Sequence, residues 1–429
     1  MISMRTICCR CFIQGYSLLF LLSLLANHTC QAAAPEQAAS GAAVEQLQQY
    51  LKTPLAERMP LPKQTFAGVA LTRADAKTSE QLLWQAQLLY LRKSRQAEMT
   101  AKTIKHGQLE MPFFYAKFGT KPASGRSMYI SMHGGGGAPK QVNDQQWENQ
   151  KRLYRLKEGV YVVPRAPTNT WNLWHQGHID PMFQRLIENM IAFEDVDPNR
   201  VYLMGYSAGG DGTYQVAPRM ADRLAAAAMM AGHPNDASPL SLRNIGFTIH
   251  MGGKDSAYNR NKVAASWGTQ LATLRKQDLK GYAHLVKIYP DKGHWMDRED
   301  AAAIPWMAEF KRNPLPRKIT WKQDDVTHER FYWLAVDDKN RRRGSLVEAS
   351  LDEQQITIEK IQGIEQLILR VNDQMINLDQ PLTVRVQGKE VFNGSVHRTI
   401  GVIAKTLMER SDPTSIFSAE VTVSVTATK

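Results

Sequence analysis

The feature that most constrains the fold of this chain is the run VYLMGYSAGGDG, residues 201–212. Residues 201–206 are mostly β-branched, aromatic or apolar, which predicts a buried strand. The chain then turns through Gly205-Tyr206-Ser207-Ala208-Gly209, a G-x-S-x-G pattern, into a segment that can be helical. The flanking positions are glycine because a Cβ there would collide with a neighbouring strand or helix. The pattern is common by chance, so a catalytic serine needs support from the rest of the chain.

Strands and helices alternate on both sides of this run, from residue 111 to residue 316. The expected strands are apolar on both faces, which is typical of a mostly parallel sheet covered by helices. We therefore expect an α/β fold for this region. Apart from the serine strand, the predicted strands are 113–118, 128–132, 160–163, 225–230, 247–251 and 285–289.

Two further regions flank the α/β region. Residues 34–110 carry apolar side chains at helical spacing and predict a helical N-terminal region that packs against the main domain. Residues 317–429 contain short alternating runs separated by turns, which predict a small all-β domain with a sandwich-like arrangement. This C-terminal domain carries no recognisable catalytic motif.

Residues 1–33 have the pattern of a secretory signal peptide. Arg5 and Arg10 give a positive start, residues 18–26 an apolar core, and Ala32–Ala34 small residues for cleavage. The apolar core is too short to span a bilayer, although an uncleaved anchor is the alternative. We expect export to the periplasm or the extracellular space, with no stable membrane span after cleavage.

Cysteine positions and charge exclude several classes of protein. All four cysteines, Cys8, Cys9, Cys11 and Cys30, lie in the signal peptide. The mature chain is therefore expected to have no disulfide, thiolate nucleophile or cysteine-bound metal. The formal net charge is +12, but the basic residues are dispersed and only residues 341–343 form a tight run. No nucleic-acid partner and no cofactor are expected.

A serine nucleophile requires a base and an acid, each at the carboxyl end of its own strand. Asp255 follows the expected strand 247–251, and His294 follows the expected strand 285–289. The order Ser…Asp…His predicts a triad of Ser207, His294 and Asp255. In it, His294 takes the proton from Ser207, and Asp255 orients the imidazole.

The run His133-Gly134-Gly135-Gly136-Gly137 follows the expected strand 128–132. Glycines leave backbone N–H groups free to face a developing negative charge, which predicts an oxyanion hole. Its donors would be the N–H groups of Gly134, Gly135 and Ala208. A flexible glycine-rich turn is one alternative. A phosphate loop is another, but no Gly-Lys-Ser/Thr sequence follows.

The stretch 171–180, WNLWHQGHID, follows the expected strand 160–163 and should border the active site. Its tryptophans offer apolar or sugar-stacking surface. His175, His178 and Asp180 suggest a metal site instead, but their spacing matches no common zinc pattern, and ordinary core packing is a third interpretation. No metal is expected. The predicted pocket residues are His133, Trp171, Trp174, His175, Tyr206 and Trp295.

The nucleophile turn, the order Ser…Asp…His and the histidine-glycine loop resemble the α/β-hydrolase superfamily. The similarity is greatest to secreted esterases, polyhydroxybutyrate-depolymerase-like or dienelactone-hydrolase-like, of which the phrase DPNRVY at 197–202 is typical. The resemblance covers residues 111–314 and implies hydrolysis through an acyl-serine intermediate. The chain departs from secreted depolymerases because its mature part has no cysteine and no aromatic binding module for a polymer.

We therefore expect an exported serine hydrolase that cleaves small-molecule or carbohydrate-linked carboxylic esters. One alternative is a peptidase of the prolyl-oligopeptidase type, which has the same catalytic order. Such enzymes usually place a propeller before the hydrolase domain, and residues 34–110 are too few to form one. The other alternative is a non-catalytic protein that binds glycans on a hydrolase scaffold. The sequence gives no oligomeric state.

Overall fold

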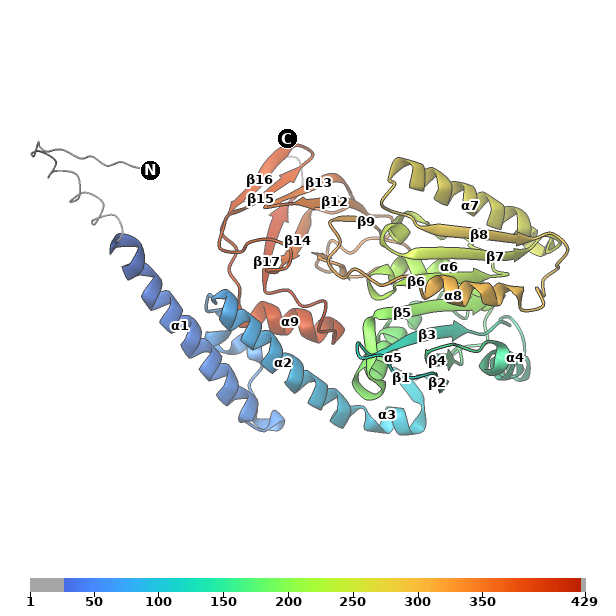
Figure 1. The fold of residues 1–429 in the computed structure, drawn as a ribbon, viewed down its shortest axis with the longest axis horizontal. Helices are drawn as coiled ribbons and strands as arrows, with labels where there is room; N and C mark the ends of the chain where they lie inside the picture. The colour runs from blue at the N-terminus through green and yellow to red at the C-terminus, as the bar shows by residue number, and fades with distance from the viewer. Residues whose placement is uncertain (1–26, 426–429) are drawn as a thin grey trace, which may run out of the picture.

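The computed structural model describes residues 27–425 of the 429-residue chain (Figure 1). The predicted signal peptide thus lies outside the described residues except for 27–33, which belong to the first helix, α1 (Asn27–Lys52). Export consequently stays a prediction.

An eight-stranded sheet forms the centre of the α/β region, in the order β1-β2-β4-β3-β5-β6-β7-β8. Strands β1 and β2 run antiparallel to their neighbours, and the other six are parallel. Each strand predicted in this region is present, so the α/β prediction is confirmed. The strands are β1 (Thr103–His106), β2 (Leu109–Phe118), β3 (Arg126–Met132), β4 (Gly159–Pro164), β5 (Val196–Tyr206), β6 (Ala226–Met230), β7 (Gly246–Gly252) and β8 (His284–Tyr289).

Helices cover both faces of this sheet because successive strand residues point to opposite sides. Met128 and Ile130 of β3 pack in one apolar cluster, and Tyr129 between them packs in the other. The first cluster includes side chains of α5 (Ile179–Glu194), α6 (Ala208–Arg219) and α7 (Arg260–Gln277). The second includes side chains of α4 (Lys140–Leu153) and α8 (Ala303–Met307). The result is the three-layered fold of α/β hydrolases. The carboxyl ends of the parallel strands lead into loops or turns.

The C-terminal region contains a four-stranded sheet, β10-β11-β14-β17, and a five-stranded sheet, β16-β15-β13-β12-β9. Apolar side chains of both sheets belong to the same core cluster as the hydrolase helices. The strands are β9 (Lys318–Lys322), β10 (Arg330–Phe331), β11 (Leu334–Ala335), β12 (Leu346–Asp352), β13 (Gln355–Gln362), β14 (Gln366–Val371), β15 (Leu382–Val386), β16 (Lys389–Gly394) and β17 (Ala419–Ser424).

This region is not all-β, because helix α9 (Ile400–Arg410) lies between β16 and β17. Ile400, Ile403 and Leu407 fall on one helical face and are buried. Thr399 caps the helix by accepting a hydrogen bond from the N–H of Val402. The apolar spacing and the cap were both present in the sequence, so the helix could have been predicted.

The N-terminal helices pack chiefly on the C-terminal region (Figure 1). Side chains of α1 and of α2 (Arg73–Ser94) share an apolar cluster with α9. Helix α2 also contacts α5 of the hydrolase region, which is the packing that the sequence predicted. After the short helix α3 (Gln96–Ala101) the chain enters β1 at Thr103, eight residues before the expected start of the α/β region.

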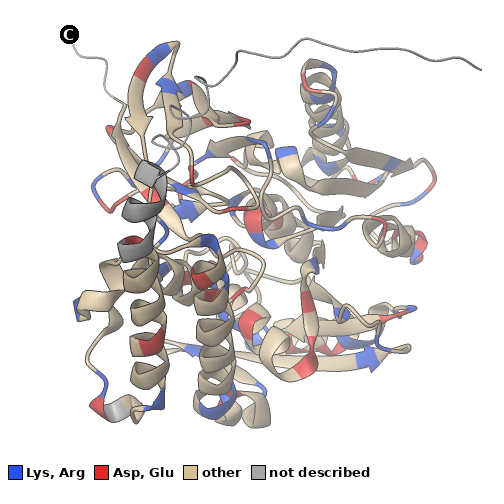
Figure 2. Ribbon diagram, turned by 60° about the vertical axis from the view of Figure 1, so that its left-hand side comes forward, with Lys and Arg blue, Asp and Glu red and all other residues tan. Residues whose placement is uncertain are grey.

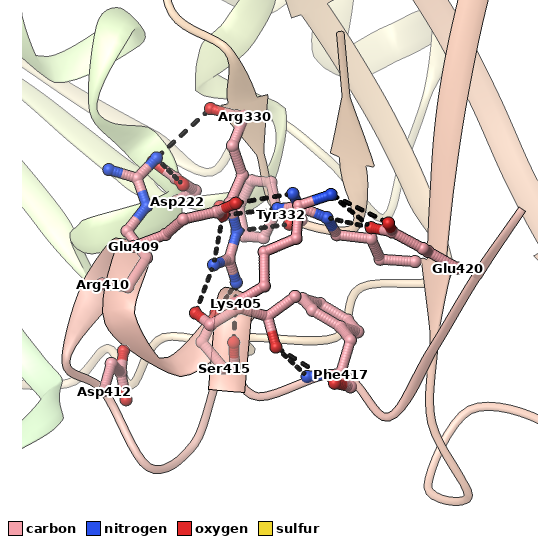
Figure 3. A network of polar contacts seen from close by, with 12 residues as sticks. Asp222, Arg330, Tyr332, Lys405, Glu409, Arg410, Asp412, Ser415, Phe417 and Glu420 are labelled. Carbon is pink, nitrogen blue, oxygen red and sulfur yellow. Dashed lines mark hydrogen bonds and ion pairs between the residues drawn. The ribbon is translucent and has the colours of Figure 1, made fainter. Parts of the chain in front are cut away.

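Buried ion pairs join α9 and the residues after it to the hydrolase region. Asp412 accepts hydrogen bonds from Arg312 at 2.6 Å and from Arg223 at 3.1 Å, and all three side chains are at most 1% exposed. Arg410 donates to Asp222 at 2.8 Å, as Figure 3 shows. We call Asp222, Arg223, Arg312, Arg410 and Asp412 the junction network.

Charged residues of both signs are otherwise interspersed along the ribbon (Figure 2). Within residues 27–425, no helix combines the length and the apolar character that crossing a membrane would require.

Candidate active site

Ser207 sits on the turn between β5 and α6 with a strained backbone, at φ 58° and ψ −121°. The surroundings impose this conformation because the chain passes close to other backbone on both sides. A Cβ on Gly205 would lie 2.1 Å from the carbonyl oxygen of Gly209, and one on Gly209 would lie 2.2 Å from that of Met132. The N–H of Ser207 donates to the carbonyl of Met230 on the adjacent strand β6 at 2.9 Å. Glycine is therefore required at both positions for the serine to project from the sheet.

The three residues expected to form a triad are in hydrogen-bond contact. Nε2 of His294 lies 2.9 Å from Oγ of Ser207, and Nδ1 lies 2.7 Å from Oδ2 of Asp255. The Asp255 side chain is buried, whereas that of His294 is 44% exposed. Each residue follows its own parallel strand, β5, β7 or β8. This arrangement can move a proton from the serine to the imidazole while the carboxylate holds the ring.

Backbone N–H groups lie beside the serine. Gly134 is so near that a Cβ on it would be 3.2 Å from the Cβ of Ser207. Ala208 is the first residue of α6, where the backbone N–H has no partner within the helix. The N–H of Gly136 donates instead to Oδ1 of Asn143, which fixes the glycine loop against α4. The glycine loop and the start of α6 thus flank Ser207.

His133 and Trp174 were expected in the substrate pocket, but both side chains are fully buried. Nδ1 of His133 bonds the carbonyl of Gly134 at 2.6 Å, and Nε2 accepts from the N–H of Ala166 at 3.1 Å. Burial lowers the pKa of His133 to about 3, so the ring is neutral. Trp174 donates its indole N–H to the carbonyl of His133 at 2.9 Å. The two side chains therefore support the glycine loop from behind, and neither lines the cavity at Ser207.

Tyr206 and His175 are also mostly buried. The Tyr206 hydroxyl donates to the carbonyl of His294 at 2.5 Å and accepts from the N–H of Met296, so it holds the histidine loop in place. His175 packs edge-on against Trp171 at 5.5 Å. Trp295 is exposed and packs against Tyr206, but it is not among the residues that line the cavity at Ser207.

A cavity of about 590 Å³ opens at Ser207. Of the residues expected in the pocket, Trp171 is the one that lines it, and the residue is 64% exposed. Tyr258, which the sequence did not indicate, also lines it and is 77% exposed. The remaining lining comes from the glycine loop, the start of α6 and the loops after β6 and β7: Gly135, Gly136, Ala208, Asp211, His233, Asn235, Asn259 and Arg260.

Two acidic or basic side chains, Asp211 and Arg260, line this cavity. Asp211, four residues after the nucleophile, accepts a hydrogen bond from the N–H of His233 at 2.6 Å, and burial raises the pKa of its carboxyl group. Arg260 lies 3.9 Å from the buried carboxylate of Asp255 and stacks over the ring of Tyr258. Both residues could have been predicted from their positions in the sequence, because each lies shortly after a predicted parallel strand, and loops at the carboxyl ends of such strands border the site.

The stretch that suggested a metal has a different role. Asp180 is buried and pairs with Arg219 and His328, both at 2.8 Å. Within residues 27–425 no group of three histidine, cysteine or acidic side chains is placed to hold a metal ion.

Residues 163–319 match the Dienelactone hydrolase family. This range includes Ser207, Asp255 and His294. This part of the chain is a dienelactone hydrolase family domain. A bifunctional acetylxylan esterase/xylanase of Neocallimastix patriciarum, XynS20E, is 34% identical over 198 residues, which are 45% of this chain and 26% of that protein. The chain thus spans about a quarter of the length of that relative.

Solved structures similar to this hydrolase domain include two esterases. A thermostable esterase has a TM-score of 0.37 and 18% identity over 49% of this chain and 62% of its own. The feruloyl esterase module from Clostridium thermocellum, complexed with sinapinate, has a TM-score of 0.35 and 16% identity over 48% of this chain and 86% of its own.

Proposed function

We propose that the chain is an exported serine hydrolase that cleaves carboxylic esters, with residues 103–316, which include strand β1, as its catalytic domain and Ser207, Asp255 and His294 as its triad. The single observation that carries this proposal is the unbroken hydrogen-bond chain from Oγ of Ser207 through His294 to Asp255. The dienelactone hydrolase family match over 163–319 supports it independently.

In the proposed reaction, Oγ of Ser207 attacks the ester carbonyl while Nε2 of His294 takes its proton. The carbonyl oxygen becomes an oxyanion, which the N–H groups of Ala208, Gly134 and Gly135 stabilise. The imidazolium then gives its proton to the leaving alcohol as the tetrahedral intermediate collapses to an acyl-serine. Water, deprotonated by His294, attacks the acyl-serine and releases the acid. Asp255 keeps the imidazole oriented and stabilises its positive charge throughout.

We further propose that the alcohol part of the substrate is a carbohydrate. Two exposed rings, Trp171 and Tyr258, offer flat apolar faces of the kind on which a sugar ring stacks. The same cavity is lined by hydrogen-bonding groups of both kinds, an acceptor on Asp211 and donors on Arg260. The acetylxylan esterase named among the relatives is consistent with this substrate class.

The proposal is tested by labelling the protein with a fluorophosphonate serine probe while short-chain 4-nitrophenyl esters are assayed in parallel. We expect labelling and turnover in the wild type. Ser207→Ala should abolish labelling and lower kcat by about 10⁶-fold, since removal of the nucleophile leaves only binding and the oxyanion hole. Ser256→Ala, which changes an exposed serine near Asp255, is the matched control and should behave as the wild type. Well-folded wild type that is not labelled would contradict the triad.

A further inference from the structure

The segment that contains Trp171 is held by contacts with residues outside the loops of the hydrolase region. Residues 168–180, which we call the wall segment, join β4 to α5 and contain no long helix or strand before α5 begins. Within it Trp171 rests edge-on against His175. The carbonyl of His175 accepts a hydrogen bond from Arg219 at 2.9 Å, which ties the wall segment to the end of the nucleophile helix α6.

A buried ionic contact continues from Arg219 to the C-terminal region. Asp180, at the end of the wall segment, accepts hydrogen bonds from Arg219 on Oδ1 and from Nε2 of His328 on Oδ2, each at 2.8 Å. Arg219 and Asp180 are almost completely buried, and His328 is mostly buried. His328 lies between β9 and β10, so the C-terminal region supplies one of the two partners of this carboxylate. We call these three residues the Asp180 bridge.

The loop that presents His328 is itself fixed. The Gln323 side chain donates to the carbonyl of His328 at 2.7 Å and accepts from its N–H at 2.9 Å. The backbone N–H of Gln323, which follows β9, donates to the carbonyl of Ser345, which precedes β12, the strand paired with β9 in the same sheet. In the same loop, Val326 comes close to Gly177 of the wall segment. The C-terminal region therefore meets the wall segment through a loop that these hydrogen bonds hold.

Asp180 is a charged carboxylate in the Asp180 bridge, which lets the bridge hold the wall segment. Burial by itself would raise the pKa of Asp180, but the Arg219 guanidinium and the hydrogen bond from His328 outweigh burial, and the pKa is lowered. The carboxylate is therefore charged, and a buried charged group tolerates little displacement from its partners. Removal of His328 would leave Oδ2 of Asp180 without its donor and would relax the contact between the two regions.

We infer that His328 is a positioning residue for substrate binding, through which the C-terminal region holds the wall segment and Trp171 at the cavity for the sugar part of the ester. The inference rests on the proposed function and deepens it, since it assigns the C-terminal region a role in substrate specificity. An ordered wall lowers the entropic cost of binding a substrate large enough to contact Trp171. A small ester that reaches Ser207 without contacting the wall gains nothing from it.

The test compares two esters in the full-length protein, 4-nitrophenyl acetate and acetylated xylotetraose. In His328→Ala, KM for acetylated xylotetraose should rise about tenfold with kcat changed by less than about twofold, while kcat/KM for 4-nitrophenyl acetate stays within about twofold. His328→Gln keeps a donor at the same reach and should restore KM. Equal losses on both esters, or no change on either, would overturn the inference.

A double-mutant cycle separates positioning of Trp171 from general stabilisation. If His328 acts through Trp171, the effect of His328→Ala on KM should fall to less than about twofold in a Trp171→Ala background. A tenfold effect in both backgrounds would contradict the inference. Should His328→Ala fail to fold, as judged by circular dichroism, Gln323→Ala replaces it, because it loosens the His328 loop and should raise KM for the sugar ester in the same selective way.

Every variant is also labelled with the fluorophosphonate probe, so that failure of the His328 inference can be told apart from failure of the hydrolase proposal. Unlabelled wild type contradicts the hydrolase proposal. The inference is then decided by calorimetry, in which His328→Ala should bind acetylated xylotetraose about tenfold more weakly than wild type, as a loosened wall costs ordering free energy on binding. Equal affinities would overturn it.

Discussion

The active site and the junction network both consist of carboxylates paired with cationic or titratable side chains, but they differ in access to water. At the active site, the imidazole of His294 is 44% exposed and stands between a buried carboxylate and an open cavity. In the junction network, Arg223, Arg312 and Asp412 are at most 1% exposed. The two regions therefore use similar chemical groups under opposite conditions of solvation.

The difference shows what burial does to a charged pair. In the junction, burial would raise the pKa of Asp412, but the guanidinium groups of Arg312 and Arg223 hold it well below its usual range. Such a carboxylate keeps its charge and cannot exchange a proton near neutral pH, so it serves to join the two regions. The proton acceptor of the active site must instead reach both substrate and water, and only the orienting carboxylate, Asp255, is buried.

The largest effect that would sharpen this comparison is expected from Asp255→Asn. The amide keeps the size of the side chain but cannot stabilise the imidazolium, and it favours the wrong tautomer of His294. We expect kcat on 4-nitrophenyl acetate to fall by about 10⁴-fold, with little change in KM. The midpoint of urea unfolding serves as the control for intact folding. A loss of less than tenfold would remove Asp255 from the triad.

At the junction, Asp412→Ala should chiefly affect stability. The substitution leaves two buried guanidinium groups without their acid, so the free energy of unfolding should fall by about 3–5 kcal/mol in urea titrations. Turnover by the folded protein should persist, because Asp412 does not line the Ser207 cavity.

The exposed pair of Lys254 and Asp291, 3.8 Å apart, gives the matched control. Asp291→Ala should change the free energy of unfolding by no more than about 0.5 kcal/mol. If the two variants were equally stable, burial would not be what distinguishes the junction.

A smaller, pH-dependent effect is expected behind the glycine loop. Burial lowers the pKa of His133 from its ordinary value of 6.5 to about 3. Between pH 6.5 and about 3, His133 binds a proton in the unfolded chain but stays neutral in the folded protein. The stabilisation from neutral His133 is therefore complete above pH 6.5 and is lost as the pH falls toward 3.

His133→Asn keeps a donor and an acceptor but does not titrate in this range. The advantage of wild type over this variant in unfolding free energy should therefore shrink as the pH falls from 7 to 4, by up to about 1.4 kcal/mol per pH unit. Urea unfolding at several pH values measures the difference. A difference that is constant with pH would mean that His133 is not held neutral by burial.

The smallest expected effect is that of Trp171→Ala on binding. Loss of one stacking face should raise KM for acetylated xylotetraose about tenfold, as much as loosening the wall segment does and near the upper end of the about 0.5–1.5 kcal/mol expected for an aromatic contact. Trp295→Ala is the matched control, since Trp295 is also an exposed ring near the triad but does not line the cavity. Equal effects of the two substitutions would mean that the substrate contacts a different surface.

The sequence by itself determined the parallel sheet and the three residues proposed for the triad. Apolar runs marked the strands, and in a parallel sheet the carboxyl ends of the strands meet at one edge. Ser207, Asp255 and His294 each follow such a run directly, so their proximity could be inferred from local patterns. The nucleophile turn was recognisable because its glycines are required by the close approach of backbone atoms on either side.

Only the tertiary structure decided which side chains face the cavity and which lie behind it. Trp171 and Trp174 are three residues apart in one loop, yet one is exposed at the cavity and the other is fully buried. The ionic contact between Asp180 and His328 joins residues 148 positions apart. Sequence spacing reports the direction of a side chain only within a regular helix or strand. In loops, and between regions distant in the sequence, side-chain direction depends on the packing of the whole fold.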